Sequence, residues 1–176
     1  FQFVLDSLAS KDTTSHTPLD LEINSLVIRR GKIKYDQLDV PVIPNDFNSN
    51  SKHLEIEGIS GHFIVNKLTD DSINVNVRKL SLKEKAGFEL KSLTFKFFAN
   101  KQTASVLGFR LELPHSLIAL DSIRAVYRFD GKKLQFPTLE YQGSISPSTI
   151  TPSDLCYFTS SLKNFRNPIT LSSDFS

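Results

Sequence analysis

Apolar and polar residues alternate along most of this chain, and this period of two constrains its fold more than any other feature. Side chains of a β-strand point alternately to opposite faces, so the pattern predicts strands with one apolar face. Helical periodicity is nearly absent before residue 150. We predict an all-β chain with about eight or nine strands before residue 145, in segments that include 21–35, 53–65, 73–85, 87–99, 104–114, 116–129 and 132–143.

The alternation slips by one residue at corresponding places in several of these segments. The template apolar-x-apolar-x-x-apolar-x-apolar keeps all four apolar residues on one face only if one extra residue forms a β-bulge. A bulge also bends its strand. The pattern therefore predicts a curved, antiparallel-rich amphipathic sheet with an apolar concave face. The template fits Leu21-Ile23-Leu26-Ile28, Val75-Val77-Leu80-Leu82 and Phe88-Leu90-Leu93-Phe95, and Leu54-Ile56-Ile59 supplies its first three members.

Little in the sequence is available to cover this apolar face. Only residues 152–165 favour a helix, with Thr151 as N-cap, Pro152 at the first position and Asp154 in the first turn. Leu155, Phe158, Leu162 and Phe165 would form its apolar stripe. Periodicity alone leaves three architectures open: two sheets packed as a sandwich, a closed barrel, or one strongly curved sheet.

Composition and charge exclude several classes of protein. The chain of 176 residues is 39% hydrophobic and 23% charged, with a net charge of +2, and its basic residues are scattered singly along strands. A concentrated basic stripe, expected of a nucleic-acid binder, is missing. The single cysteine, Cys156, excludes an internal disulfide. We expect a single domain over 1–176, cut from a longer repetitive β protein, with a flexible loop at about 39–52.

Catalytic and metal-binding motifs are missing as well. His16, His53, His62 and His115 lie far apart beside turns, and no carboxylate at ligand spacing completes a metal site. Gly143-Ser144-Ile145-Ser146 lacks the second glycine of a nucleophile elbow. Cys156 has no histidine near it in sequence and is expected to be a packing residue. We predict a protein that is not an enzyme and that binds neither a metal nor a cofactor.

Three stretches together resemble one family of Gram-negative envelope proteins. Residues 21–36 (LEINSLVIRRGKIKYD), 73–123 and 150–169 (ITPSDLCYFTSSLKNFRNPI) are similar to TamB of the translocation and assembly module and to the wider AsmA-like group. The most distinctive part is KLSLKEKAGFELKSL (79–93) followed by LELPHSLIALDSI (111–123). The resemblance covers residues 20–170 loosely. It implies a U-shaped β-taco sheet, a periplasmic location, and a parent chain that is anchored in the inner membrane and carries a DUF490 region.

The resemblance also implies a function and partners. Such proteins carry phospholipid between the inner and outer membranes or assist outer-membrane protein assembly with an Omp85-type partner. The expected ligands are phospholipid acyl chains, which would lie in a hydrophobic groove. No reaction would be catalysed there. The alternative is an extracellular β-sandwich module for binding or adhesion, with loop 39–52 as its recognition element. The predicted groove lining is Val75, Val77, Leu80, Leu82, Phe88, Leu90, Leu93, Phe95, Phe97, Phe109, Leu111 and Leu113.

Overall fold

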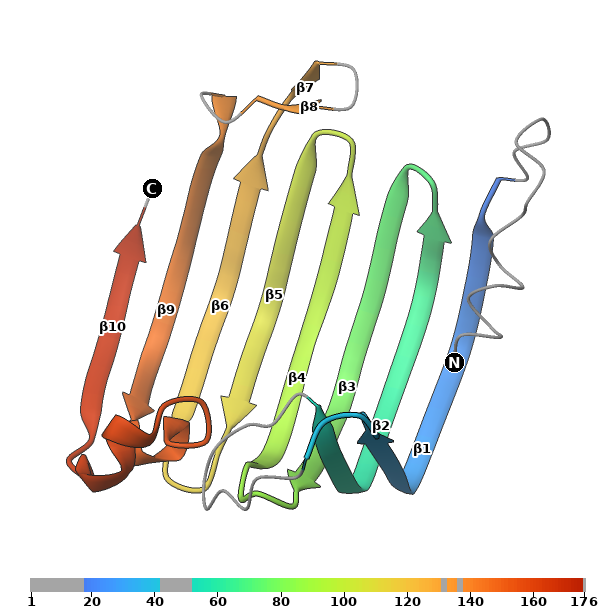
Figure 1. The fold of residues 1–176 in the computed structure, drawn as a ribbon. Helices are drawn as coiled ribbons and strands as arrows, with labels where there is room; N and C mark the ends of the chain where they lie inside the picture. Colours follow the sequence, from blue (N-terminus) through green and yellow to red (C-terminus); the bar gives the residue numbers. More distant parts are fainter. Residues whose placement is uncertain (1–17, 42–51, 131–132, 136–137, 176) are drawn as a thin grey trace.

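A computed structural model of the chain describes residues 18–41, 52–130, 133–135 and 138–175. Most of these residues belong to one open antiparallel sheet of eight strands, in the order β1-β2-β3-β4-β5-β6-β9-β10 (Figure 1). The order follows the chain, so nearly every connection is a hairpin. The all-β prediction is confirmed. The strands are β1 (Asp20–Asp36), β2 (His53–Thr69), β3 (Ser72–Glu84), β4 (Glu89–Asn100), β5 (Thr103–Glu112), β6 (Leu117–Val126), β9 (Glu140–Ile150) and β10 (Ile169–Phe175).

The remaining elements are short. A hairpin of β7 (Phe129–Asp130) and β8 (Lys133–Leu134) separates β6 from β9 along the chain. Two 3₁₀ helices, η2 (Pro152–Leu155) and η3 (Ser160–Asn164), connect β9 to β10. The predicted sandwich alternative would place a second large sheet on the apolar face. Among the described residues there is no such layer; the recognition loop of that alternative lies mostly in 42–51, outside the described residues.

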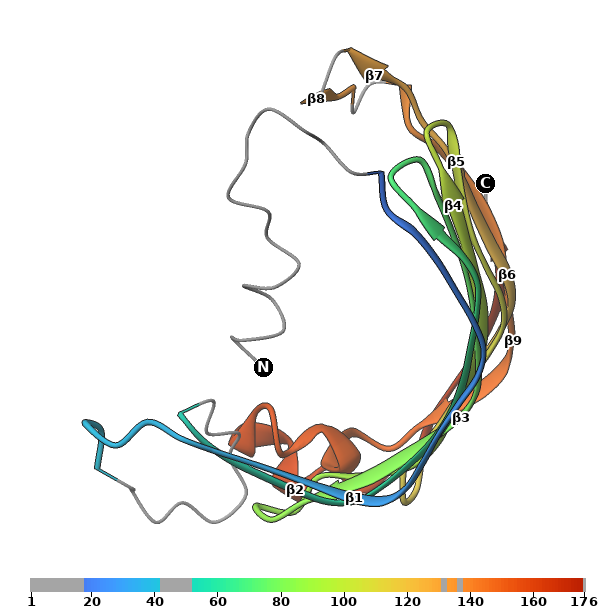
Figure 2. The same cartoon turned by 90° about the vertical axis from the view of Figure 1, so that its right-hand side faces the viewer.

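The sheet bends strongly along its strands. Seen from the side, the strands follow an arc, and η2 and η3 lie inside that arc at one end (Figure 2). All four predicted slips coincide with register shifts between neighbouring strands, which confirms the bulged sheet. The shifts fall between Ile23 and Leu26 in β1, between Ile56 and Ile59 in β2, between Val77 and Leu80 in β3, and between Leu90 and Leu93 in β4.

Three residues at register shifts adopt a left-handed backbone conformation. Gly58 has φ of 63° and Gly108 has φ of 57°, and a side chain at such a φ is strained. Arg30, at a further shift in β1, has φ of 52° although it is not a glycine. For a residue with a Cβ this conformation costs about 1–2 kcal/mol. The bulges that bend the sheet are therefore set by backbone conformation as well as by hydrophobic spacing.

Arg30→Gly is expected to stabilise the fold by about 0.5–1 kcal/mol, because the relief of the left-handed strain exceeds the extra entropy of glycine in the unfolded chain. Gly108→Val is expected to destabilise it by about 2 kcal/mol, since a β-branched residue tolerates this conformation poorly. Urea denaturation monitored by circular dichroism measures both. Val27→Gly, at an exposed and regularly paired position of the same strand, is the control and should lose stability. A loss for Arg30→Gly as well would contradict the strain argument.

The short C-terminal helix predicted over 152–165 is present, but it is divided into two 3₁₀ helices. Phe158 and Phe165 of the expected apolar stripe are 61% and 60% exposed. Thr151 makes no side-chain cap; its hydroxyl donates to the His115 carbonyl at 2.9 Å. Asp154 accepts hydrogen bonds from the His115 backbone N–H at 2.8 Å and the Ser116 hydroxyl at 2.7 Å. These groups tie the segment to the β5–β6 turn instead of extending a helix.

Strand β9 runs further than the sequence pattern indicated, through Pro147 to Ile150. Proline lacks the N–H that a sheet ladder uses. Next to it, the Ser148 hydroxyl accepts from the Ala119 N–H at 2.9 Å and donates to the Ala119 carbonyl at 3.2 Å. A side chain thereby replaces backbone pairing between β6 and β9 at this point, which allows the strand to continue past the proline.

Stability is expected to fall as the pH drops from about 4.5 to about 2, because of Glu55. Its carboxylate lies 2.6 Å from Lys32 Nζ and 2.9 Å from Lys85 Nζ, and these hydrogen bonds lower its pKa from 4.5 to about 2. A carboxyl group with a lowered pKa in the folded state stabilises above its unfolded pKa, and this contribution disappears as the pH falls through the folded value. Thermal denaturation across this range measures the slope. Glu55→Gln should flatten it, and an unchanged slope in that variant would contradict the assignment.

Candidate functional site on the concave apolar face

A ladder of apolar side chains runs along the centre of the sheet. Residues paired across an antiparallel ladder project from the same face, so the pairs identify which side chains lie together. Strands β3 and β4 contribute five such pairs, which follow the strands for about 30 Å at the usual strand rise. The pairs are Ile73–Ala99, Val75–Phe97, Val77–Phe95, Leu80–Leu93 and Leu82–Leu90.

This ladder faces the inside of the arc. The two 3₁₀ helices lie inside the arc (Figure 2). Tyr157, in the connection between them, contacts Phe88, with the ring centroids 5.4 Å apart and the rings tilted by 38°. Phe88 immediately precedes β4 and lies two residues before Leu90, so the two side chains point to the same face. Intervening residues of β4 such as Thr94 and Lys96 pair with Arg110 and Leu107 and project from the convex side. The apolar face is therefore the concave one.

The apolar concave face continues into the flanking strands. Leu93 pairs with Leu111 of β5, and Leu111 pairs with Ile118 of β6. The Phe95 and Phe109 rings lie 6.3 Å apart across the β4–β5 bulge. The sequence-based lining included Phe109 and Leu111 of β5 but no residue of β1, β2, β6 or β9, although the alternation in those strands is the same. Concave residues that it missed include Ile23, Leu26, Ile28, Phe63, Val65, Ile118, Leu120, Ile123 and Ile145.

The concave side chains are covered only partly. Of the predicted lining residues, Val77 and Leu90 are each 6% exposed and Leu113 is 5% exposed; the others are half-buried. Among the described residues, no large side chain is less than 2% exposed. A core between two packed layers would bury many such side chains almost completely. The structure thus places all the predicted lining residues on or beside one face that no second sheet of the described chain covers.

Apolar residues become more exposed toward the two edges of the sheet. On the edge strand β1, Leu26 and Ile33 are 45% and 48% exposed, and on the opposite edge, β10, Ile169 and Leu171 are 58% and 45% exposed. An edge residue has a neighbouring strand on one side only. The apolar surface therefore extends to both edges rather than ending in a polar border.

The 3₁₀ segment closes one end of the concave face. Tyr157 is 6% exposed and contacts Phe88, and its ring also meets Phe158 edge-on at 5.1 Å. Glu84 is buried at this end and accepts a hydrogen bond from the Ala86 N–H at 2.6 Å. Burial, together with the charge and hydrogen bonding of Glu84, raises the pKa of Tyr157 to about 12. The Tyr157 phenol therefore stays protonated beside Glu84.

The other candidate groups of the sequence lie apart from the concave face or support the fold. His53 contacts Asp36 at 3.3 Å and the Val40 carbonyl at 2.9 Å, and His115 contacts Asp154 at 2.9 Å. Cys156 is half-buried and lines the same small pocket as His115. His16 lies outside the described residues. Within the described part of the chain, no group of three or more His, Cys, Asp or Glu residues is placed to hold a metal ion.

Two further observations bear on identity. None of the helices in the described segments has the length and apolar character needed to cross a membrane. Comparisons with protein-family models, with curated proteins and with solved structures returned no match to this chain.

Proposed function

We propose that this chain is a non-enzymatic lipid-handling module whose concave face shields phospholipid acyl chains from water. One observation carries the proposal: the apolar concave face spans the strands of the sheet, and its side chains stay half-buried with no second layer of the described chain over them. Contiguous apolar surface of this kind marks an interaction site. An acyl chain in water is unfavourable by about 0.8 kcal/mol per CH₂, or on the order of 10 kcal/mol in total.

The side chains on this face suit such a ligand. Leu, Ile, Val and Phe dominate the ladder, and they offer dispersion contacts without polar groups that need a partner. Because each strand bends along its length, the two ends of the strands flank the concave face, and a flexible chain on that face has apolar surface on more than one side (Figure 2). No bond has to form or break. The proposed chemistry is removal of apolar surface from water.

The wider setting is proposed from the family resemblance. We infer a segment of a TamB-like or AsmA-like parent protein in the periplasm, anchored in the inner membrane. There it would assist phospholipid transport toward the outer membrane, or outer-membrane protein assembly with an Omp85-type partner. The curved, bulged sheet with an apolar interior supports this setting because it matches the β-taco shape that the resemblance implies.

Lipid capture by the purified chain tests the proposal. The chain is incubated with dioleoyl-phosphatidylcholine vesicles and separated from them by gel filtration, and the bound lipid is then quantified by mass spectrometry. We expect lipid to co-elute with the protein. Added oleate should displace this lipid from the protein, whereas glycerophosphocholine should not. A protein fraction without lipid would overturn the proposal, and so would displacement by glycerophosphocholine but not by oleate, because the site would then recognise the headgroup alone.

A further inference from the structure

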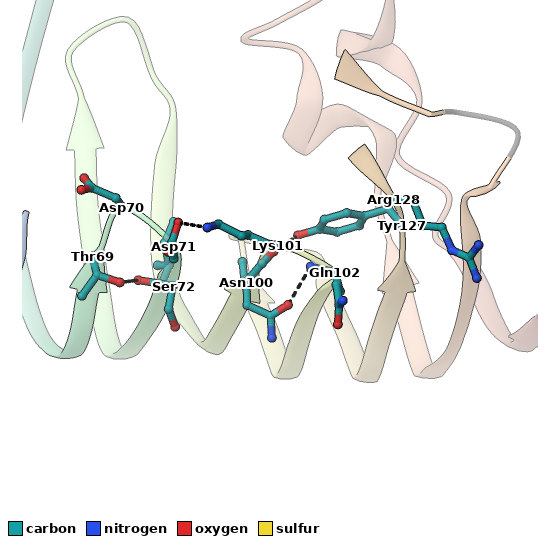
Figure 3. Close-up of a pocket in the computed structure, with 11 residues that line it drawn as sticks. Thr69, Asp70, Asp71, Ser72, Asn100, Lys101, Gln102, Tyr127 and Arg128 are labelled. Carbon is teal, nitrogen blue, oxygen red and sulfur yellow. Dashed lines mark hydrogen bonds and ion pairs between the residues drawn. The ribbon is translucent and has the colours of Figure 1, made fainter. Parts of the chain in front are cut away.

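The end of the concave face opposite the 3₁₀ segment opens into a depression of about 890 Å³ at the rim of the sheet. It is formed by the β2–β3 turn, the β4–β5 turn and the residues that follow β6 (Figure 3). Ile73 and Ala99 line it, and this pair is also the outermost rung of the apolar ladder. The depression is thus continuous with the surface that is proposed to hold acyl chains.

The rim of this depression carries charges of both signs. Asp71 pairs with Lys101 at 2.6 Å, bridging the two turns. Asp70 and Arg128 also line the depression and lie at its opposite ends, with the Asp71–Lys101 pair between them (Figure 3). Two carboxylates and two basic groups give no net charge. The acidic groups belong to the β2–β3 turn, whereas the basic groups belong to the β4–β5 turn and to the chain after β6.

Hydrogen bonds hold the wall of the depression in place. The Asn100 side chain accepts from the backbone N–H groups of Gln102 and Thr103, both at 2.8 Å, which fixes the β4–β5 turn. The Tyr127 hydroxyl donates to the Asn100 carbonyl at 2.7 Å, and the Tyr127 N–H donates to the Gln102 carbonyl at 2.9 Å. Tyr127 therefore joins the end of β6 to the neighbouring turn (Figure 3). Such a preorganised wall loses little freedom when a ligand binds.

We propose that this depression holds the headgroup of the bound lipid and selects zwitterionic headgroups over anionic ones. A headgroup with both a phosphate and an ammonium can place the phosphate toward Lys101 and Arg128 and the ammonium toward Asp70 and Asp71. A headgroup with a phosphate alone brings a net negative charge next to two carboxylates. The inference rests on the proposed function, because it requires that acyl chains occupy the adjoining ladder.

Competition between two lipids with the same acyl chains tests the selection. Vesicles with equal amounts of dioleoyl-phosphatidylethanolamine and dioleoyl-phosphatidylglycerol are incubated with the chain, and the captured lipids are quantified after gel filtration. We expect the wild-type chain to enrich the ethanolamine lipid roughly fivefold, the effect of about one exposed charge contact. Asp70→Lys should remove this enrichment. Arg128→Glu should weaken capture of both phospholipids by a similar factor, because both carry a phosphate.

Matched variants on the convex face control for net charge. Glu22→Lys and Arg124→Glu make the same two charge changes at exposed positions. Glu22 follows Leu21 and Arg124 follows Ile123, and because those two residues belong to the concave face, Glu22 and Arg124 project from the convex one. These variants should change the lipid ratio less than twofold. If the wild-type chain captures lipid without a headgroup preference, or if the convex variants alter the ratio as much as the rim variants, the headgroup site is refuted while the acyl-chain site stands. If no lipid is captured at all, the proposed function fails as well.

Discussion

Phe95→Asp is expected to reduce acyl-lipid capture at least tenfold. Phe95 lies in the middle of the ladder, pairs with Val77 and approaches Phe109. A carboxylate at this position would have to stay hydrated or lie against hydrocarbon, and a charge in an apolar lipid environment costs about 2.5–3.5 kcal/mol even where it can reach water. A loss of 1.4 kcal/mol corresponds to a tenfold change in affinity. Capture from phosphatidylcholine vesicles, measured as above, gives the ratio.

Thr94→Asp is the matched control for this prediction. Thr94 is the adjacent residue of β4, pairs with Arg110 and projects from the convex face, and its substitution makes the same change in net charge. Lipid capture should stay within twofold of the wild type. Circular dichroism of both variants verifies that the sheet remains folded. Equal losses in the two variants, or full capture by Phe95→Asp, would show that the lipid does not lie on the concave face.

Leu90→Ala is expected to lower the free energy of unfolding by about 2–3 kcal/mol. Leu90 is 6% exposed and pairs with Leu82 at the closed end of the concave face, near Phe88 and Tyr157. Truncation of a buried leucine costs the transfer free energy of the lost methyl groups and leaves a cavity. The expected loss lies at the low end of the usual range, because the only layer that covers the sheet near Leu90 is the short 3₁₀ segment. Urea denaturation measures the loss.

Leu107→Ala is the control for the role of Leu90. Leu107 is 39% exposed and pairs with Lys96 on the convex face, so its truncation should cost less than 1 kcal/mol. Similar losses for the two leucines would contradict the assignment of faces. The prediction also separates two parts of the concave surface: the end near the 3₁₀ segment contributes to folding, whereas the open part around Phe95 is available to a ligand.

The bulged, curved sheet could be predicted from the sequence because hydrophobic spacing records it directly. Leu90 and Leu93 stand three residues apart, and an apolar face can hold both only if a bulge lies between them. The register shift at that position, and those in β1, β2 and β3, follow from the same constraint. The in/out period could not distinguish one curved sheet from a sandwich or a barrel, because each architecture requires the same alternation.

The two ends of the concave face could not be predicted, because they depend on contacts between residues far apart in sequence. The apolar spacing of 155–165 indicated an α-helix, but Asp154 and Thr151 form hydrogen bonds to the β5–β6 turn, and Tyr157, which was outside the expected stripe, is the buried residue. At the other end, Asp71 and Lys101 each stand in an ordinary turn sequence. Only the order of the strands brings them together at one rim.

A photo-crosslinking scan through β4 shows whether bound lipid lies on the concave face. A photoreactive phenylalanine analogue is placed in turn at each position from Leu90 to Phe97, and the chain is irradiated with phosphatidylcholine vesicles. Lipid adducts should form at Leu93, Phe95 and Phe97 and be absent at Lys91, Ser92, Thr94 and Lys96, which project from the convex face or lie in the bulge. Leu90, which is buried at the closed end, should form few adducts. Adducts at every position, or none at the concave positions, would contradict the account.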